Sequence, residues 1–535
     1  MRMNRFFIYF LLTGLLSGCA TNNKGTSTID WSDINATANS VMPSNLYGRP
    51  SDGYGTDVDE KNHHIAVLLP LSGANALVGQ TIRSSVMASV LSNAPNSLSV
   101  SFFDTGDDAT GAIKSALEIS PDVIIGPVFA DNARALRDIK PNDLSVLSFT
   151  SDASALGNGV ITMALMPANG VEAIIKEMSS DKIKNFIIIA PDTNSGHLMA
   201  GVAKAASAYY SPELNGVFFY QESNPDSIKD IAQTASMNNM RVAANTRARE
   251  VLSDILTNEQ LNILEKSSLN NQLEKISKME TVGGVPYDGI LFLGNANDSK
   301  TLASFLRYYN VTASDARFYG TTVWDGADIA SDLTMSGAKF ATLPQIKPEF
   351  NLLYEQVSSV PVSRLASFGY DATNMAIGMM YSGGDMLSYL FNPSGYNGTD
   401  GLFRLLTTGE NERAVRIMQL NASGTPVQVR ATATNFITPI YNIQQHNVSP
   451  IKSSEIKTIG IDVDDYIKIP ERFHDKYNSD PIGANTRNAP VIEQSKIVAI
   501  LPDEEGEIFK SQNYTPIKNE RVSRSYIDEY EVFEE

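Results

Sequence analysis

Residue types that perform catalysis are sparse in this chain of 535 residues, and none falls in a recognised catalytic spacing. No Walker A sequence, GxSxG elbow or HExxH metal motif occurs, and the Asp104–Asp108 cluster lacks EF-hand spacing. The histidines are His63, His64, His197, His446 and His474. Matches to Ser-x-x-Lys, without a Lys-Thr-Gly partner, begin at Ser179, Ser336, Ser449 and Ser454. We therefore predict a protein that is not an enzyme and has neither a metal site nor a cofactor.

Small polar and aromatic residues follow several apolar segments that resemble strands. Hydroxyl and backbone N–H groups there could hold a carboxylate, Asp325 could accept from an ammonium, and an aromatic ring could stack on an apolar group. Taken singly, each of these residues also fits ordinary turn or helix-capping chemistry. Their recurrence at one edge predicts a ligand-binding cleft formed by Ser72, Gly73, Phe129, Ala130, Thr150, Ser151, Ser195, Asn295, Trp324 and Asp325.

The segment His64–Ile82 contains the elements that would position such a cleft. The apolar run Ile65–Leu69 leads into Pro70 and a Ser72-Gly73 turn, and apolar residues then recur at helical spacing. This pattern is typical of the first strand and helix of a doubly wound sheet. In such sheets ligands bind at the carboxyl ends of the strands, where helix N-termini expose unpaired N–H groups.

The same strand–helix unit repeats to about residue 430, which predicts an α/β fold with parallel sheets. About 380 residues exceed one such sheet, so we expect two Rossmann-like lobes joined by a hinge. A single eight-stranded barrel is the alternative, disfavoured by irregular unit lengths. The polar, helix-favouring segment Met240–Met279 reads as an insertion. Predicted boundaries are 63–164 with 345–402 for the first lobe, and 165–344 with 403–448 for the second.

The N-terminus predicts export and lipidation. Two arginines precede an apolar stretch of about 11 residues, too short to span a bilayer, and Leu16-Ser17-Gly18-Cys19 resembles a bacterial lipobox. We expect a signal peptide over 1–18 and a lipid on Cys19, with an ordinary signal peptide as the alternative. Cys19 is the only cysteine, so no internal disulfide can form. Ala20 in place of Asp favours the outer membrane by the enterobacterial sorting pattern.

Charge and composition limit the partners and the ends of the chain. The formal net charge of −18 argues against nucleic acid and against an anionic membrane surface. Residues 19–62 are rich in Asn, Ser, Thr and Gly and read as a flexible tether. The segment 449–535 is polar and ends acidic. We expect it to be largely disordered or docked as an extended arm.

Several segments together resemble a known family. Five segments are similar, in order and spacing, to type I periplasmic binding proteins of the leucine-binding kind: IAVLLPLSGANALVGQTIRSSVMAS, DVIIGPVFADNARAL, FIIIAPDTNSGHLMAGVAKAA, SFGYDATNMA and GYNGTDGLFRL. Within that superfamily, several pieces resemble the penicillin-binding protein activators of the LppC group, namely LLPLSGANALVGQTIR, APDTNSGH, YGTTVWDG, RLASFGYDATNMA and the lipobox. The resemblance covers residues 63 to about 430 and implies two lobes hinged around a cleft.

The resemblance implies two functions. The first is a non-enzymatic envelope lipoprotein that regulates peptidoglycan synthesis by contacting a penicillin-binding protein, with an amino-acid-like ligand as an optional regulator. The second is the substrate-binding protein of a branched-chain amino-acid ABC importer, which would close on its ligand by hinge motion. Solute-binding relatives carry serines where this chain has Phe129-Ala130, and Tyr-Gly where it has Ser195-Gly196. These departures favour the first function. Because residues 19–62 read as a tether, we also expect no counterpart of the helical-repeat N-terminal domain that the enterobacterial activator carries.

Overall fold

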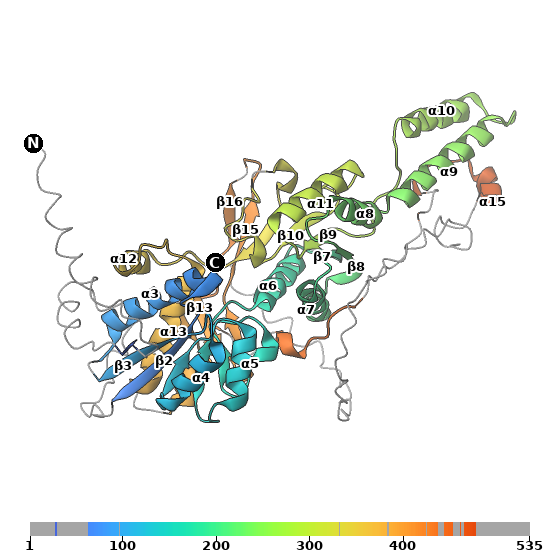
Figure 1. Ribbon diagram of the computed structural model, residues 1–535. Helices are drawn as coiled ribbons and strands as arrows, with labels where there is room; N and C mark the ends of the chain where they lie inside the picture. Colours follow the sequence, from blue (N-terminus) through green and yellow to red (C-terminus); the bar gives the residue numbers. More distant parts are fainter. Residues whose placement is uncertain are drawn as a thin grey trace, which may run out of the picture. The chain divides into compact units, whose positions relative to one another are not determined.

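The computed structural model of the protein describes residues 27–28 and 62–477, except 96, 331, 382–384, 424, 437–442, 453–460 and 462–464. The predicted signal peptide, Cys19, most of the predicted tether and residues 478–535 lie outside this range. Within it, helices and strands alternate as predicted and form two parallel sheets with helices on their faces (Figure 1). We call each sheet with its helices a lobe.

The first lobe contains a six-stranded sheet in the order β1-β3-β2-β4-β5-β6. All neighbouring pairs are parallel except β1 with β3. Because β3 and β4 lie on opposite sides of β2, the strand order reverses between β2 and β4, which is where such sheets bind ligands. The strands are β1 (Ser27–Thr28), β2 (His63–Leu69), β3 (Leu98–Asp104), β4 (Val123–Ile125), β5 (Ser145–Ser148) and β6 (Val160–Thr162).

Helices cover both faces of this sheet, which explains why β2 is apolar throughout. Ile65, Val67 and Leu69 point to one face and pack with residues of α3 and α13. Ala66 and Leu68 point to the other and pack with residues of α4 and α5. The helices are α3 (Ala76–Asn93), α4 (Ala109–Glu118), α5 (Ala130–Ile139), α12 (Pro348–Val357), α13 (Arg364–Tyr381) and α14 (Met386–Leu390), with 3-10 turns η1 (Gly73–Asn75) and η2 (Ala153–Ala155).

The second lobe contains a seven-stranded sheet in the order β16-β15-β11-β10-β9-β7-β8. Its five strands from β7 to β11 are parallel and repeat the order of the first lobe, and β15 and β16 add an antiparallel edge. The strands are β7 (Asn185–Pro191), β8 (Glu213–Tyr220), β9 (Gly289–Phe292), β10 (Arg317–Gly320), β11 (Lys339–Thr342), β15 (Arg416–Leu420) and β16 (Pro426–Arg430).

Alternate residues of β7 again separate two cores. Ile187 and Ile189 join residues of α8 and α11, whereas Phe186, Ile188 and Ala190 join residues of α6 and α7. The helices of this lobe are α6 (Pro167–Ser180), α7 (Asn194–Tyr210), α8 (Pro225–Ala235), α9 (Asn238–Leu256), α10 (Ile263–Ser277) and α11 (Ala296–Tyr308), with 3-10 turns η3 (Thr322–Trp324) and η4 (Leu333–Met335).

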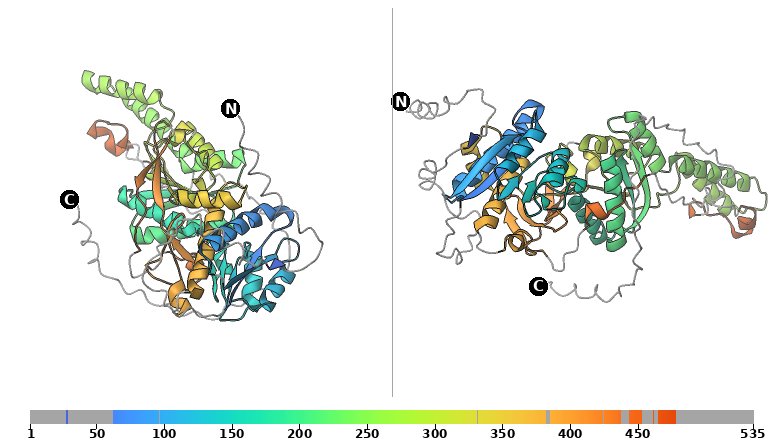
Figure 2. Two further views of the ribbon diagram at one scale, coloured as in Figure 1. Left: turned by 90° about the vertical axis from the view of Figure 1, so that its left-hand side faces the viewer. Right: turned by 60° about the horizontal axis from the view of Figure 1, so that its bottom comes forward.

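The predicted insertion is a helical hairpin of α9 and α10, which lie side by side in Figures 1 and 2. Its core contains no residue of either sheet and is completed from the C-terminal part of the chain by Ile461, Ile467, Phe473 and Tyr477. Of the two alternatives predicted for the tail, the docked arm therefore describes residues 465–477. This arm includes η7 (Glu471–Phe473) and α15 (His474–Tyr477), and η5 (Gln445–Asn447) precedes it.

The chain crosses between the lobes three times: between β6 and α6, between β11 and α12, and before β15. Buried side chains connect these crossings. The Asn411 amide donates to the carbonyls of Thr162 (2.9 Å) and Ala164 (2.6 Å). Arg413 donates to the Met163 carbonyl (2.6 Å) and to the buried Asp400 carboxylate (3.0 Å). These contacts join the first and third crossings. A small antiparallel sheet supports them, formed by β12 (Tyr396–Gly398), β13 (Gly401–Leu405) and β14 (Asn411–Arg413).

The predicted α/β fold of two doubly wound lobes is confirmed by the strand order. One local difference concerns the boundary predicted at residue 402. Phe403 and Leu405 of β13 pack in the first lobe's core rather than in the second lobe, because the small sheet lies against α13.

Candidate functional site

A pocket of about 360 Å³ opens at the carboxyl ends of β2, β3 and β4, where the strand order of the first lobe reverses. Ser72 and Phe129 from the predicted site line it. Gly73 lies beside it with φ +71°, and a Cβ there would come within 3.7 Å of Asp107 Oδ1. The remaining lining residues are Pro70, Ala74, Asn75, Thr105, Gly106, Asp107, Ala109, Asp131 and Asn132.

Asp104, the last residue of β3, fixes two of the three loops around the pocket. Its Oδ1 accepts backbone N–H bonds from Leu71 (2.7 Å), Ser72 (3.2 Å) and Gly106 (2.8 Å). Partial burial acts to raise the pKa of Asp104, but hydrogen bonds from Ser72, Gly106 and Leu71 outweigh it and hold that pKa below its ordinary value. The ionised carboxylate therefore ties the loop after β2 to the loop after β3.

The other predicted residues of the first lobe have mostly structural contacts. Thr150 is buried, its hydroxyl accepts the Asp152 N–H (3.1 Å), and its carbonyl accepts the Thr162 hydroxyl (2.6 Å). Ser151 is exposed outside the pocket. Ala130 begins α5 next to Phe129 but does not line the pocket. Thr150 thus supports the turn, as the capping alternative proposed.

In the second lobe the strand ends are filled by the protein's own side chains. Trp324, in the turn after β10, is only 1% exposed, and its indole N–H donates to the Gly294 carbonyl (3.2 Å). Tyr220 is buried on the other side of Gly294, so close that a Cβ on Gly294 would lie 1.9 Å from its hydroxyl. The prediction that the Trp324 ring stacks on a ligand does not match this burial, because the ring is packed between Phe292 and Phe340.

The side chains of Asn295 and Asp325 are bonded within the protein, and Ser195 lies outside the pocket. The Asn295 side chain caps α11 by accepting the Asp298 N–H (2.9 Å). Ser195 is exposed in the first turn of α7, which Thr193 caps. Asp325 pairs with Arg364 of α13 (3.2 Å), which also donates to the Leu343 carbonyl (3.1 Å). The carboxylate predicted to accept from a ligand ammonium therefore joins the second lobe to the first.

Sequence reasoning missed the loop after β3, which contributes Thr105, Gly106 and Asp107 to the pocket. The signal was present, because this loop follows an alternating strand with the same polar, glycine-containing sequence as the Ser72-Gly73 turn. In a doubly wound sheet, the loops that follow two neighbouring parallel strands, here β2 and β3, lie side by side.

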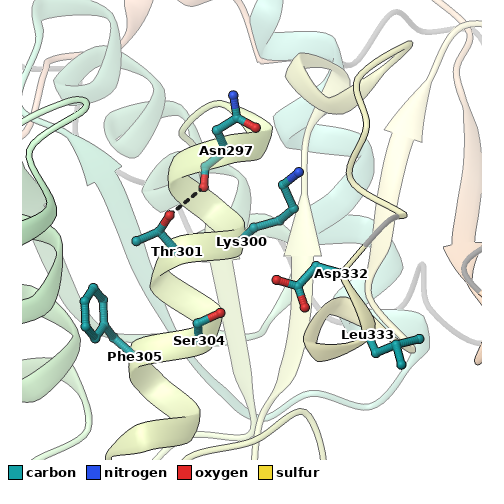
Figure 3. Close-up of a pocket in the computed structure, with 7 residues that line it drawn as sticks. All are labelled: Asn297, Lys300, Thr301, Ser304, Phe305, Asp332 and Leu333. Carbon is teal, nitrogen blue, oxygen red and sulfur yellow. Dashed lines mark hydrogen bonds between the residues drawn. The ribbon is translucent and has the colours of Figure 1, made fainter.

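A larger hollow, of about 770 Å³, lies along α11 in the second lobe and contains none of the predicted residues. Figure 3 shows Lys300 and Ser304 directed from α11 toward the turn that holds Asp332, while Phe305 points to the opposite side of the helix. It is an open surface depression along the side of α11. We therefore assign the candidate site to the smaller pocket of the first lobe.

No group of three or more metal-ligating side chains occurs within the described part of the chain. Likewise, none of the described helices combines the length and apolar character needed to cross a membrane.

The fold and the pocket define a protein of two doubly wound lobes with its candidate site in the first. Residues 59–379 match the family described as "LppC putative lipoprotein", and the chain belongs to this LppC family. It is 29% identical over 141 residues to the penicillin-binding protein activator LpoA of Mannheimia succiniciproducens, covering 25% of this chain and 24% of that protein. It is 22% identical over 224 residues to the uncharacterized protein RP748 of Rickettsia prowazekii, covering 41% and 59%.

The chain thus spans less than two thirds of the length of either relative. Among solved structures, the C-domain of LpoA from Haemophilus influenzae, described as a regulator of PBP1A, is similar with 16% identity and a TM-score of 0.47, covering 68% of this chain and 99% of that one.

Proposed function

We propose that this protein is a non-enzymatic envelope lipoprotein that contacts a penicillin-binding protein and thereby regulates peptidoglycan synthesis. The observation that carries the proposal is the family match across residues 59–379, which spans both lobes, together with the similarity to a protein named as a penicillin-binding protein activator. Cys19 is the proposed point of lipid attachment, and the outer membrane is the proposed location.

The chemistry of the second lobe supports a role in protein contact over one in enclosing a solute. A receptor that closes on an amino acid needs free polar groups on both lobes. Here Trp324 is buried, Asn295 caps a helix and Asp325 is paired with Arg364. These three groups are already used within the protein.

The pocket of the first lobe favours a second candidate, the substrate-binding protein of an amino-acid-type ABC importer. It lies at the strand reversal, where doubly wound sheets bind ligands, and Ser72 and Phe129 line it. In that function the pocket would bind leucine or a related amino acid, and binding would stabilise the fold by about 2.7 kcal/mol at a hundred times the dissociation constant.

Two measurements test the proposal. Full-length lipidated protein, immobilised on beads, is mixed with membrane extract whose penicillin-binding proteins have been labelled covalently with a fluorescent penicillin. We expect one labelled band to be retained, and the purified synthase of that band to polymerise glycan faster when the protein is added. Retention of no labelled band, combined with a thermal shift on adding leucine, would favour the importer.

The anchor is tested separately by replacing Cys19. Cys19→Ser should abolish incorporation of radiolabelled palmitate and release the protein from the outer-membrane fraction, since durable anchoring depends on the acyl chains. Ser17→Ala, which leaves the thiol in place, is the control and should still be labelled. A Cys19→Ser protein that still takes up palmitate contradicts the assignment.

A further inference from the structure

The side chains around the first-lobe pocket form an unusual set for an amino-acid site. Those that line it offer two amides, two hydroxyls and two carboxylates, and none of the described lining residues is basic. The polar residues are Ser72, Asn75, Thr105, Asp107, Asp131 and Asn132. Amides and hydroxyls both donate and accept hydrogen bonds, so the set suits a ligand rich in hydroxyl groups.

The hydroxyl of Thr105 at this pocket is buried without a partner among the described residues. Thr105 is 5% exposed, and its Oγ1 makes no hydrogen bond within the described part of the chain. Nearly all buried polar groups in folded proteins are hydrogen-bonded, and the exceptions commonly mark a water or ligand position. Because Thr105 lines the pocket, an occupant of the pocket is one group, besides an ordered water, that could satisfy its hydroxyl.

Charge argues against an anionic occupant. Asp107 is exposed at the pocket and makes no hydrogen bond or ion pair within the described residues. Asp131, in the first turn of α5, places a second carboxylate at the helix N-terminus, where an anion would otherwise bind. Asp131 is paired with Arg134 (2.5 Å), which does not line the pocket. The carboxylate of an amino acid would therefore meet acidic groups without a compensating cation.

Phe129 supplies the apolar part of the site. It occupies the N-cap position of α5 and is 39% exposed at the pocket, although most large apolar side chains of this lobe are buried. A pyranose ring has one apolar face of C–H groups and an edge of hydroxyls. An exposed aromatic ring beside amides and a carboxylate matches both features.

We propose that this pocket binds a neutral sugar, with the ring face against Phe129 and the hydroxyl edge toward Thr105, Asp107 and Asn132. The volume of about 360 Å³ lies near the lower end of the range for small-ligand sites, which suits one or two sugar rings. The proposal goes beyond the proposed contact with a penicillin-binding protein and does not depend on it.

The test is isothermal titration calorimetry of the full-length protein in detergent with N-acetylglucosamine and its β1,4-linked disaccharide, beside leucine and glutamate. We expect saturable binding of at least one sugar and none of glutamate. Phe129→Ala should weaken sugar binding at least about tenfold through loss of the stacking face. Tyr308→Ala removes an exposed aromatic ring on α11, outside the pocket, and should leave binding unchanged.

Thr105→Val provides a variant that keeps the side-chain shape. It removes only a hydroxyl that has no internal partner, so the fold should remain as stable while sugar affinity falls several-fold. Absence of sugar binding by the folded wild-type protein overturns the proposal, as does binding that survives Phe129→Ala unchanged. Tight binding of leucine alone also overturns it and supports the importer. Retention of a labelled penicillin-binding protein is a separate readout, so either proposal can fail without the other.

Discussion

At the end of β4 in the first lobe, the Phe129 ring is 39% exposed at a pocket, whereas just after β10 in the second lobe the Trp324 ring is 1% exposed inside the core. Both lobes have the same parallel strand order, and in both an aromatic residue follows a strand. The two strands are not equivalent, because β10 corresponds by strand order to β5 rather than to β4, and a glycine in β10 makes room for Trp324. A Cβ on Gly320 would come within 2.4 Å of the Trp324 ring, so only glycine leaves room for the ring to fold back over its strand.

Two lobes with the same strand order can therefore differ in whether the ends of their strands form a pocket or are filled by side chains. The first keeps a polar hollow whose loops are fixed by Asp104. In the second, Trp324 and Tyr220 fill the space around Gly294 and add to the core. Four predictions test this contrast, beginning with the largest effect.

Removing the two aromatic rings should have very different effects on stability. We expect Trp324→Ala to lower the free energy of unfolding by about 3–5 kcal/mol because it leaves a cavity in the core. Phe129→Ala should lower it by only about 1 kcal/mol because the residue is 39% exposed and lies outside the core. Urea denaturation of the full-length protein measures both. Equal losses would mean that the two strand ends do not differ as described.

Gly320→Ala tests the reason for the contrast. The added methyl would overlap the Trp324 ring, and we expect a loss of about 1–3 kcal/mol from overpacking. Gly284→Ala is the matched control, since a Cβ there meets nothing within 4 Å. Tryptophan fluorescence during denaturation would also report a shifted Trp324 environment. If both alanine variants unfold alike, Gly320 does not determine how Trp324 packs.

The ion pair next to Trp324 should contribute less. Arg364 and Asp325 have side chains 28% and 30% exposed, so solvent and salt screen their attraction. We expect Asp325→Asn to cost about 0.2–1 kcal/mol in low salt and less at 1 M salt. Asp332→Asn, in the same loop but away from Arg364, tests specificity. A cost that does not fall with added salt would contradict an ion-pair origin.

The smallest effect concerns the hairpin that only the second lobe carries. The guanidinium of Arg472 donates to both carboxylate oxygens of Glu265 (2.7 Å each) and is the main cause that lowers the Glu265 pKa to about 2. Because the folded-state pKa is depressed, this contact stabilises the docked arm above the ordinary pKa of glutamate. The stabilisation is lost as the pH falls from there toward 2.

Carboxyl-carbon NMR titration measures the Glu265 pKa directly. Arg472→Ala should raise it toward the ordinary value for glutamate. Lys278→Ala, which removes the exposed partner of Glu274, should leave it in place. A Glu265 pKa that stays near 2 without Arg472 would assign the shift to another group.

The fold was predictable because its signals are local and repeated. The apolar runs of β2 and β7 and the striped helices between strands follow directly from burial on both sheet faces. A small part of the pocket was predictable too, since Ser72 and Phe129 follow adjacent strands across the reversal point. Residues of this kind are found by position in the strand order rather than by motif.

What the sequence could not reveal depends on contacts between distant residues. Nothing near Asp325 indicates that Arg364, 39 positions later, will occupy its carboxylate. The burial of Trp324 depends on Gly294 and Ser299 from another strand end. The sequence allows the docked arm only as one of two alternatives, because its apolar residues are widely spaced. They form a common apolar surface only where they pack against α9 and α10.

The position of β13 has a consequence for how the chain is made. Phe403 and Leu405 complete a core that begins at Ile65, while all five parallel strands of the second lobe lie between Asn185 and Thr342. During synthesis from the N-terminus, all parallel strands of the second lobe would thus be made before the residues that complete the core of the first lobe. The first lobe therefore stays dependent on residues some 340 positions downstream of its opening strand, and β15 and β16 of the second lobe follow later still.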